Sequence, residues 1–220
     1  VDAVHAEVRG WTSGTPRPWI PSKSGRTQPV VALEHRKTEQ AHFCLALKGL
    51  SSTHPDRYEL DMLNVILGEG MSSRLFLELR EKHGLAYDAH SAVSHFLDDG
   101  ALTIYAGVDP ARIKDAVKMA RQQIDGMKMR VPDSELDKAK AMTKGRLLLR
   151  TEDSRSMAGW VGTQELLFHE VKTVDQVAEI IDGITTEGME RVANDIFGRP
   201  LHLAVVGPFR SALRFERLLK

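Results

Sequence analysis

The chain has 220 residues, of which 42% are hydrophobic and 27% are charged, as expected for a globular protein with a buried core. Its 30 Lys and Arg residues balance its 30 Asp and Glu residues, and this neutrality argues against nucleic acid as a partner. No apolar run is long enough to span a bilayer. The single cysteine, Cys44, cannot form an intrachain disulfide and fits a reducing compartment. We therefore expect a cytoplasmic protein, although a periplasmic one is compatible with the same composition.

The first residues have the pattern of a helix that ends before a linker. Three valines within residues 1–8 share one helical face. Residues 12–29 are rich in Pro, Gly, Ser and Thr, a composition typical of linkers. We expect residues 1–29 to be the end of a preceding domain with its linker, and residues 30–220 to form one globular domain.

Strands are expected early in this domain, followed by helices and one closing strand. Residues 41–47 are apolar on both faces, which predicts a central strand. Asp99-Gly100 predicts a hairpin. This order indicates an α+β fold, with a mixed, mostly antiparallel sheet covered by helices on one face. The expected strands are 30–33, 41–47, 87–96, 101–108 and 201–206, and the expected helices are 56–67, 72–83, 110–127, 133–150, 154–168, one that opens with a capping box at Thr173, 186–197 and 209–219.

Residues 68–87 are the most informative stretch. A glycine turn precedes a short amphipathic helix, Gly84 ends that helix, and a strand begins near Tyr87. Arg80 falls in the last helical turn, so its planar cation and the phenol of Tyr87 are expected to lie close together on a helix-to-strand corner. Such a pair can hold a peptide carbonyl or an oxyanion.

The histidines do not form a zinc-peptidase motif. His-Glu-x-x-His and His-x-x-Glu-His place two imidazoles on one helical face. Of the 9 histidines, only His169 is directly followed by Glu, and the residue four positions after it is Thr173. His90 and His95 stand five apart on one expected strand and should face opposite sides. We therefore expect no metal ligand in this chain.

Several of these features together resemble the C-terminal half-domain of the insulinase/pitrilysin family of zinc metallopeptidases, especially its mitochondrial and bacterial processing-peptidase branch. The resemblance runs through Ile-Leu-Gly-Glu-Gly-Met-Ser-Ser-Arg-Leu-Phe at 66–76, Leu-Arg-Glu-Lys-His-Gly-Leu-Ala-Tyr at 79–87 and Ile-Tyr-Ala-Gly at 104–107. Residues 1–29 resemble the exit helix of the preceding half and the linker after it. Glu69 is a departure, because the family usually has a third glycine at that position.

The resemblance implies one of two similar α+β sandwich halves that close like a clamshell. Zinc is expected in the N-terminal half, and no cofactor in this chain. Arg80 and Tyr87 are implied to bind the substrate backbone and to stabilise the tetrahedral oxyanion at the scissile carbonyl. The implied partners are a peptide substrate, a zinc-bearing half or subunit, and a second copy or subunit in a homo- or heterodimer. Alone, the chain is expected to be proteolytically inert.

Two other functions stay open at this point. The same family includes members that have lost zinc and act as structural or regulatory subunits, in which the pair would only help binding. An unrelated α+β ligand-binding module would require the signature match to be accidental. At the level of residues, the alternatives are an ion pair of Arg80 with Glu78 or Glu81, and a half-buried strand position for Tyr87.

Overall fold

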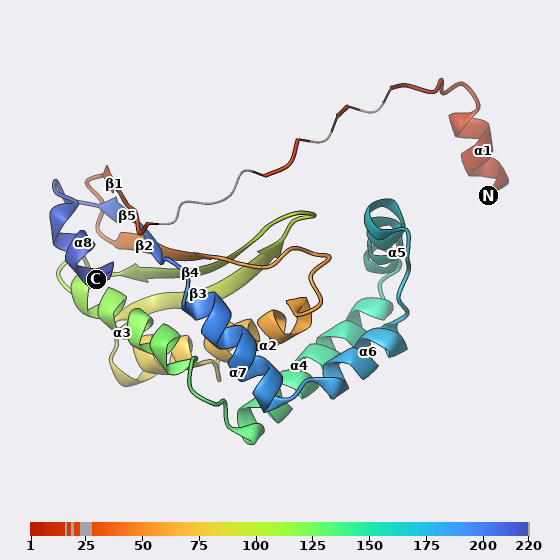
Figure 1. The fold of residues 1–220 in the computed structure, drawn as a ribbon. Coiled ribbons are helices and arrows are strands. Elements are labelled where there is room, and N and C mark those ends of the chain that lie inside the picture. Colours follow the sequence, from red (N-terminus) through yellow and green to blue (C-terminus); the bar gives the residue numbers. More distant parts are fainter. Residues whose placement is uncertain (16, 19, 23–27, 220) are drawn as a thin grey trace.

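The computed structural model describes residues 1–15, 17–18, 20–22 and 28–219, and within them one five-stranded sheet organises the chain (Figure 1). The strand order across the sheet is β1-β5-β2-β4-β3. β1 and β5 run parallel, and the other neighbouring strands run antiparallel. The strands are β1 (Val31–His35), β2 (Ala41–Lys48), β3 (Ala86–His95), β4 (Gly100–Val108) and β5 (His202–Gly207).

β2 lies at the centre of the sheet, as its apolar sequence predicted. It pairs with β4 on one side and with β5 on the other. Alternate side chains of β2 are fully buried towards the helices, while those on the opposite face are half-buried. The buried set is Ala41, Phe43, Leu45 and Leu47.

Helices cover one face of this sheet (Figure 1). α2 contacts β3, α3 contacts β4, α7 contacts β2 and α8 contacts β5. Further out, α4 packs against α2, and α6 packs against α4. The sheet is therefore mixed, mostly antiparallel and covered on one face, which confirms the predicted α+β class. The helices are α2 (Arg57–Gly68), the π-helix η1 (Phe76–Lys82), α3 (Ile113–Gly126), α4 (Asp133–Thr151), α5 (Ser154–Phe168), α6 (Val174–Gly183), α7 (Thr186–Phe197) and α8 (Leu213–Leu219).

Local signals explain where several elements begin. The Thr173 side chain accepts a hydrogen bond from the backbone of Gln176, whose side chain accepts one from the backbone of Thr173, so the predicted capping box is present at α6. Asp109 caps the turn ahead of α3 by accepting a hydrogen bond from the Ala111 backbone at 2.8 Å. The expected apolar stripe of α3 is almost entirely buried, and it consists of Ile113, Val117, Ala120, Ile124 and Met127.

Two predicted helices differ from the structure. The helix expected over residues 72–83 is a π-helix over most of its length, from Phe76 to Lys82. The last helix begins at Leu213 rather than at Phe209. The Phe209 backbone instead donates to the Gly207 carbonyl at 2.8 Å, and its ring meets Phe215 edge-on at 5.3 Å, so it anchors the chain to the end of β5.

Residues near the N-terminus lie away from the sheet. α1 (Asp2–Val8) has no buried residue and is drawn at the end of the molecule that carries α5 (Figure 1). The predicted linker over residues 12–29 falls partly outside the described residues. None of the described helices is long and apolar enough to cross a membrane.

Candidate functional site

The corner between η1 and β3 is built from two buried leucines and a left-handed glycine. Leu75 and Leu79 are fully buried and fix the helix against the core. Gly84 has φ = 52°, a conformation in which a side chain is strained, and this reverses the chain after the helix. The Leu85 backbone then donates to the Leu79 carbonyl at 2.6 Å, so β3 begins directly beside the helix it follows.

Arg80 lies between two aromatic rings at this corner. Its guanidinium carbon is 5.0 Å from the centre of the Phe76 ring and 5.2 Å from the centre of the Tyr87 ring. Both distances are in the range of cation–π attraction. Because η1 has i→i+5 hydrogen bonds, residues four apart come almost into line, and Phe76 supports Arg80 from within the helix. π-Helical turns of this kind often occur at functional sites.

Tyr87 is the extra residue of a β-bulge. Ala86 pairs with Val108 and Asp88 pairs with the next residue of β4, Gly107, so Tyr87 has no partner in the ladder. A bulge re-aims the side chain at the extra position. Tyr87 is 76% exposed, which excludes the half-buried strand position considered from the sequence.

The structure gives little support to the alternative role of Arg80 as a partner in an ion pair. Glu78 accepts a hydrogen bond from Lys82 at 2.6 Å. Glu81 lies 3.9 Å from the Nε atom of Arg80, at the limit of an ion pair between exposed groups, where such pairs contribute little. The structure therefore places the guanidinium beside the phenol, exposed to solvent. Within the described residues, neither the Arg80 nor the Tyr87 side chain forms a hydrogen bond that would occupy its donors.

A buried polar network holds α2 against β3 behind this corner. Ser91 on β3 donates to the side-chain oxygen of Asn64 at 2.6 Å, and both residues are buried. The Asn64 amide donates to Glu69, which also pairs with Arg146 on α4. Glu69 thus ties the glycine turn to two helices. Sequence reasoning missed this network, although a polar Asn at a core position of α2 was the available signal.

Arg74 braces the same turn from the other side. Its Nε atom donates to Glu135 at the start of α4 at 2.9 Å, and its terminal nitrogen donates to the Gly126 carbonyl at 3.2 Å. These contacts join the segment just before η1 to the end of α3 and the start of α4. The base of the corner is therefore fixed by charge-assisted hydrogen bonds.

The two strand histidines face opposite sides of the sheet, as predicted. His90 lies on the face without helices, where its ring meets Tyr105 at 5.1 Å. His95 lies on the helical side, where Nδ1 is 2.7 Å from the Leu50 carbonyl and Nε2 is 3.1 Å from Asp61. Burial lowers the pKa of His95, but the hydrogen bonds with Asp61 and Leu50 outweigh burial and raise it above its ordinary value.

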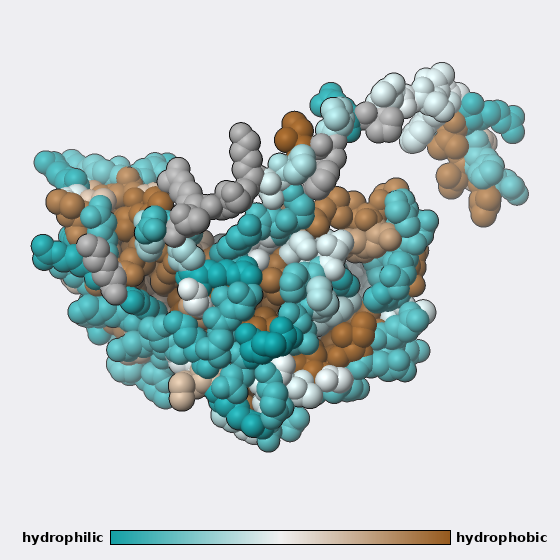
Figure 2. Space-filling view, viewed as in Figure 1, coloured by the Kyte–Doolittle hydropathy of each residue, from teal (hydrophilic) through white to brown (hydrophobic). Residues whose placement is uncertain are grey.

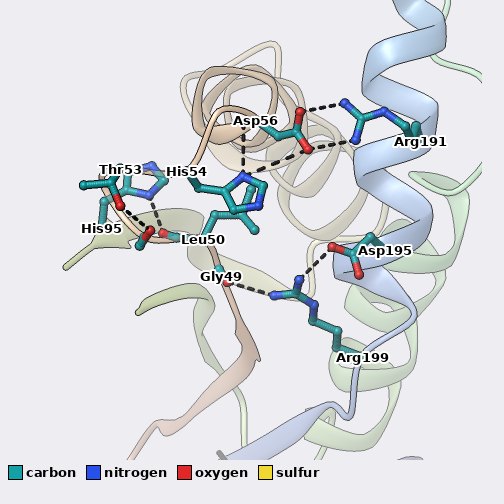
Figure 3. Close-up of polar contacts among 10 residues, drawn as sticks. Gly49, Leu50, Thr53, His54, Asp56, His95, Arg191, Asp195 and Arg199 are labelled. Atoms are coloured by element: carbon teal, nitrogen blue, oxygen red, sulfur yellow. Dashed lines mark hydrogen bonds and ion pairs between the residues drawn. The ribbon is translucent and has the colours of Figure 1, made fainter. Parts of the chain in front are cut away.

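The loop between β2 and α2 is held by arginines of α7 and the segment after it (Figure 3). Arg191 donates to both carboxylate oxygens of Asp56, at 2.8 and 2.6 Å, and these hydrogen bonds lower the pKa of that carboxyl. Arg199 donates to the Gly49 carbonyl at 2.8 Å and to Asp195 at 2.7 Å. These contacts make the loop part of the rigid frame.

The described residues do not form a metal centre. No three His, Cys, Asp or Glu side chains among them are grouped closely enough to hold an ion. The donor set of this part of the chain therefore does not fit zinc. What the corner between η1 and β3 offers instead is a pair of hydrogen-bond donors of different shape.

The known proteins that this chain resembles agree with one another. The family model described as "Peptidase M16 inactive domain" matches residues 6–143. A protein of Streptomyces coelicolor named as an uncharacterized zinc protease is 39% identical over 182 residues, which cover 82% of this chain and 40% of that protein. YmxG of Bacillus subtilis, also named as an uncharacterized zinc protease, is 35% identical and matched over 79% of this chain and 42% of its own length. The structure of a protease from Helicobacter pylori aligns with a TM-score of 0.79 at 24% identity, over 89% of this chain and 48% of that one.

These matches agree with the family resemblance of the sequence motifs described above. The chain spans less than half the length of each of these relatives. The family model covers more than half of the chain, and the two curated relatives exceed 30% identity. The chain therefore belongs to the insulinase/pitrilysin (M16) family of zinc metallopeptidases, as a C-terminal half-domain of the inactive type.

Proposed function

We propose that this chain is the non-zinc half of a processing-type metallopeptidase and that Arg80 and Tyr87 bind the backbone of an extended peptide and stabilise the oxyanion of the tetrahedral intermediate. The observation that carries this proposal is their geometry. The guanidinium carbon lies 5.2 Å from the ring of Tyr87, on an exposed corner that a bulge and a π-helix shape together.

The chemistry of the two groups supports this role. A guanidinium offers several N–H donors in a fixed fork, which suits two neighbouring carbonyls of a peptide or a carbonyl and a carboxylate. A phenol offers one directional O–H donor. Donors held in place before the reaction stabilise developing negative charge most strongly in a site closed to water. Closure would come from a second half, which explains why both groups are exposed in this chain.

We assign zinc to the preceding half of the full-length protein. The relatives are named zinc proteases, and the described residues of this chain hold no cluster that fits the ion. We accordingly expect this chain to be proteolytically inert alone and active only with a zinc-bearing half or subunit, in the bacterial cytoplasm. The rival function is that of a catalytically inactive structural or regulatory subunit, in which the same pair only docks a peptide.

Peptide cleavage by the full-length protein tests the proposal. We expect Arg80→Ala and Tyr87→Phe each to lower kcat roughly a hundredfold or more, the usual scale for loss of an oxyanion donor, with a smaller change in KM. Lys82→Ala is the matched control, because Lys82 is an exposed cation on the same helix, paired with Glu78. Unchanged turnover in both variants would refute the catalytic role. A rise in KM alone, or a full-length protein that binds peptides without cleaving them, would favour the rival function.

A further inference from the structure

A cavity of about 1210 Å³ lies between α2, α4, α5, α6 and the turn that joins β3 to β4. Around its opening, Phe96, Leu97 and Leu167 are 59%, 38% and 46% exposed. Hydrophobic side chains gather around α5 in the space-filling view (Figure 2). The cavity is somewhat larger than most small-molecule pockets, which have about 300–1,000 Å³. Its floor is apolar and buried, and it consists of Met62, Leu147, Val177 and Ile181.

Arg57 lies in the wall of this cavity and is held in place by its neighbours. Its guanidinium carbon is 4.5 Å from the centre of the Tyr58 ring and 5.9 Å from the centre of the Phe168 ring, so it joins the start of α2 to the end of α5. Its terminal nitrogens donate to the Ser52 carbonyl and, at 2.8 Å, to the Tyr58 hydroxyl. The remaining N–H donors of this guanidinium have no partner among the described residues.

The positive charge of Arg57 is not compensated within the described part of the chain, where no carboxylate forms an ion pair with it. The neighbouring carboxylates have other partners, in the pairs Asp56–Arg191, Asp61–His95 and Glu170–Lys172. A half-buried guanidinium with free donors and no carboxylate of its own is suited to an anion from outside the chain.

The other polar side chains of the lining are mostly bonded within the chain. The Trp160 indole donates to the Lys172 carbonyl at 3.2 Å, and the Gln164 side chain accepts from the Lys172 backbone at 3.1 Å. Further lining residues are paired in the same way, namely Ser52 with Phe96, Ser156 with Asp153 and Asp98 with Ser22. A buried peptide would need donors and acceptors for each of its backbone groups. The lining therefore suits a ligand with one anionic group and an otherwise apolar body.

More positive charge lies at the opposite end of α5 from Phe168. Arg150 and Arg155 line the cavity there, and neither has an ion pair with a residue that the structure describes. Such charges attract anionic ligands to a site. We propose that the cavity binds a free long-chain alkyl carboxylate, with its carboxylate on Arg57 and its chain on the apolar floor beside Gly159 and Trp160. This binding site is independent of the proposed peptidase role.

Calorimetric titration of the full-length protein tests the head group. Decanoate is expected to bind at one saturable site, and more tightly than 1-decanol or decyltrimethylammonium. Arg57→Met should weaken decanoate binding about tenfold or more, the scale of a hydrogen bond to a charged group, and should change 1-decanol binding much less. Lys118→Met is the matched control, because Lys118 is an exposed cation of α3 that does not line the cavity.

The alkyl chain is tested by filling the cavity and by changing the ligand. A Cβ atom added to Gly159 meets no atom within 4 Å, and leucine favours a helix more than glycine does, so Gly159→Leu should fold and occupy the cavity. It should weaken decanoate and 1-decanol alike, about tenfold or more. Gly162→Leu is the matched control, because Gly162 has equally open surroundings on the same helix but does not line the cavity. In the wild type, affinity should rise about threefold to fourfold for each CH₂ group from octanoate to dodecanoate.

Several results would overturn the inference. The wild type could show no saturable binding of decanoate, or it could bind decyltrimethylammonium at least as tightly. Decanoate could bind Arg57→Met and Gly159→Leu as it binds the wild type, which would place the ligand elsewhere in the full-length protein. Equal losses of decanoate and 1-decanol in Arg57→Met would count against the guanidinium as the head-group site, and equal affinities of octanoate and dodecanoate would count against the apolar floor.

Discussion

Replacing Ser91 with Ala removes the hydroxyl that joins the edge strand β3 to α2. This hydroxyl donates to the side-chain oxygen of Asn64 at 2.6 Å, and the two residues are 4% and 3% exposed. Every buried side-chain nitrogen or oxygen of the described residues has a hydrogen-bond partner. After the substitution, the Asn64 oxygen would be buried with no side-chain donor. A group left in that state destabilises a protein by about 1–3 kcal/mol.

For a chain of this size, 1 kcal/mol corresponds to about 2–4 °C in Tm, so the middle of that range predicts a fall of about 4–8 °C. Thermal unfolding followed by calorimetry measures it. Ser94→Ala, an exposed serine on the same strand, is the control and should change stability by less than about 0.5 kcal/mol. In an Asn64→Ala background the acceptor is already absent, so Ser91→Ala should then have little effect. Equal losses in both backgrounds would refute the reasoning.

Three further changes test other parts of the frame. Gly100→Ala would bring a Cβ atom into overlap with the Leu50 carbonyl oxygen, and we expect the free energy of unfolding in urea to fall by about 1–3 kcal/mol. An unaltered unfolding midpoint would count against this close contact. The pKa of His95 is raised in the folded state, so its contribution with Asp61 is complete below the ordinary value of 6.5 and is lost as pH rises through the folded pKa. The stability difference between wild type and His95→Gln should therefore shrink as the buffer goes from pH 6 towards alkaline values, and a constant difference would contradict this. Thr173→Ala removes the cap of α6 and should destabilise the protein by about 0.5–2 kcal/mol in thermal unfolding, whereas an unchanged Tm would show that the capping box contributes little.

Short-range signals carried most of the fold prediction. Residues 41–47 are apolar on both faces and form the central strand, and Asp99-Gly100 stands at the end of the expected hairpin. The closeness of Arg80 and Tyr87 followed from Gly84, because a left-handed residue turns the chain back at a fixed place. These features depend on a few neighbouring residues, so the sequence displays them directly.

The remaining features depend on contacts that the sequence does not display. Leu75 and Leu79 have the spacing of an α-helix, and their pattern does not distinguish i→i+4 from i→i+5 hydrogen bonds. Asn64 and Ser91 are 27 residues apart, so their hydrogen bond exists only once α2 has packed on β3. The adjacent polar pair at 87–88 breaks the period of two in β3, and this was the available sign of the bulge.

The bulge at Tyr87 changes the phase of β3. Side chains of a strand alternate between two faces, so an extra residue exchanges the faces for everything on one side of it. Ala86 and Ala89 are both buried although they are three positions apart, which a regular strand does not allow. Transplanting this corner into another scaffold would therefore require the inserted position as well as the tyrosine. A graft that copied the side chain onto an unbroken ladder would direct the phenol differently and leave the arginine without its neighbour.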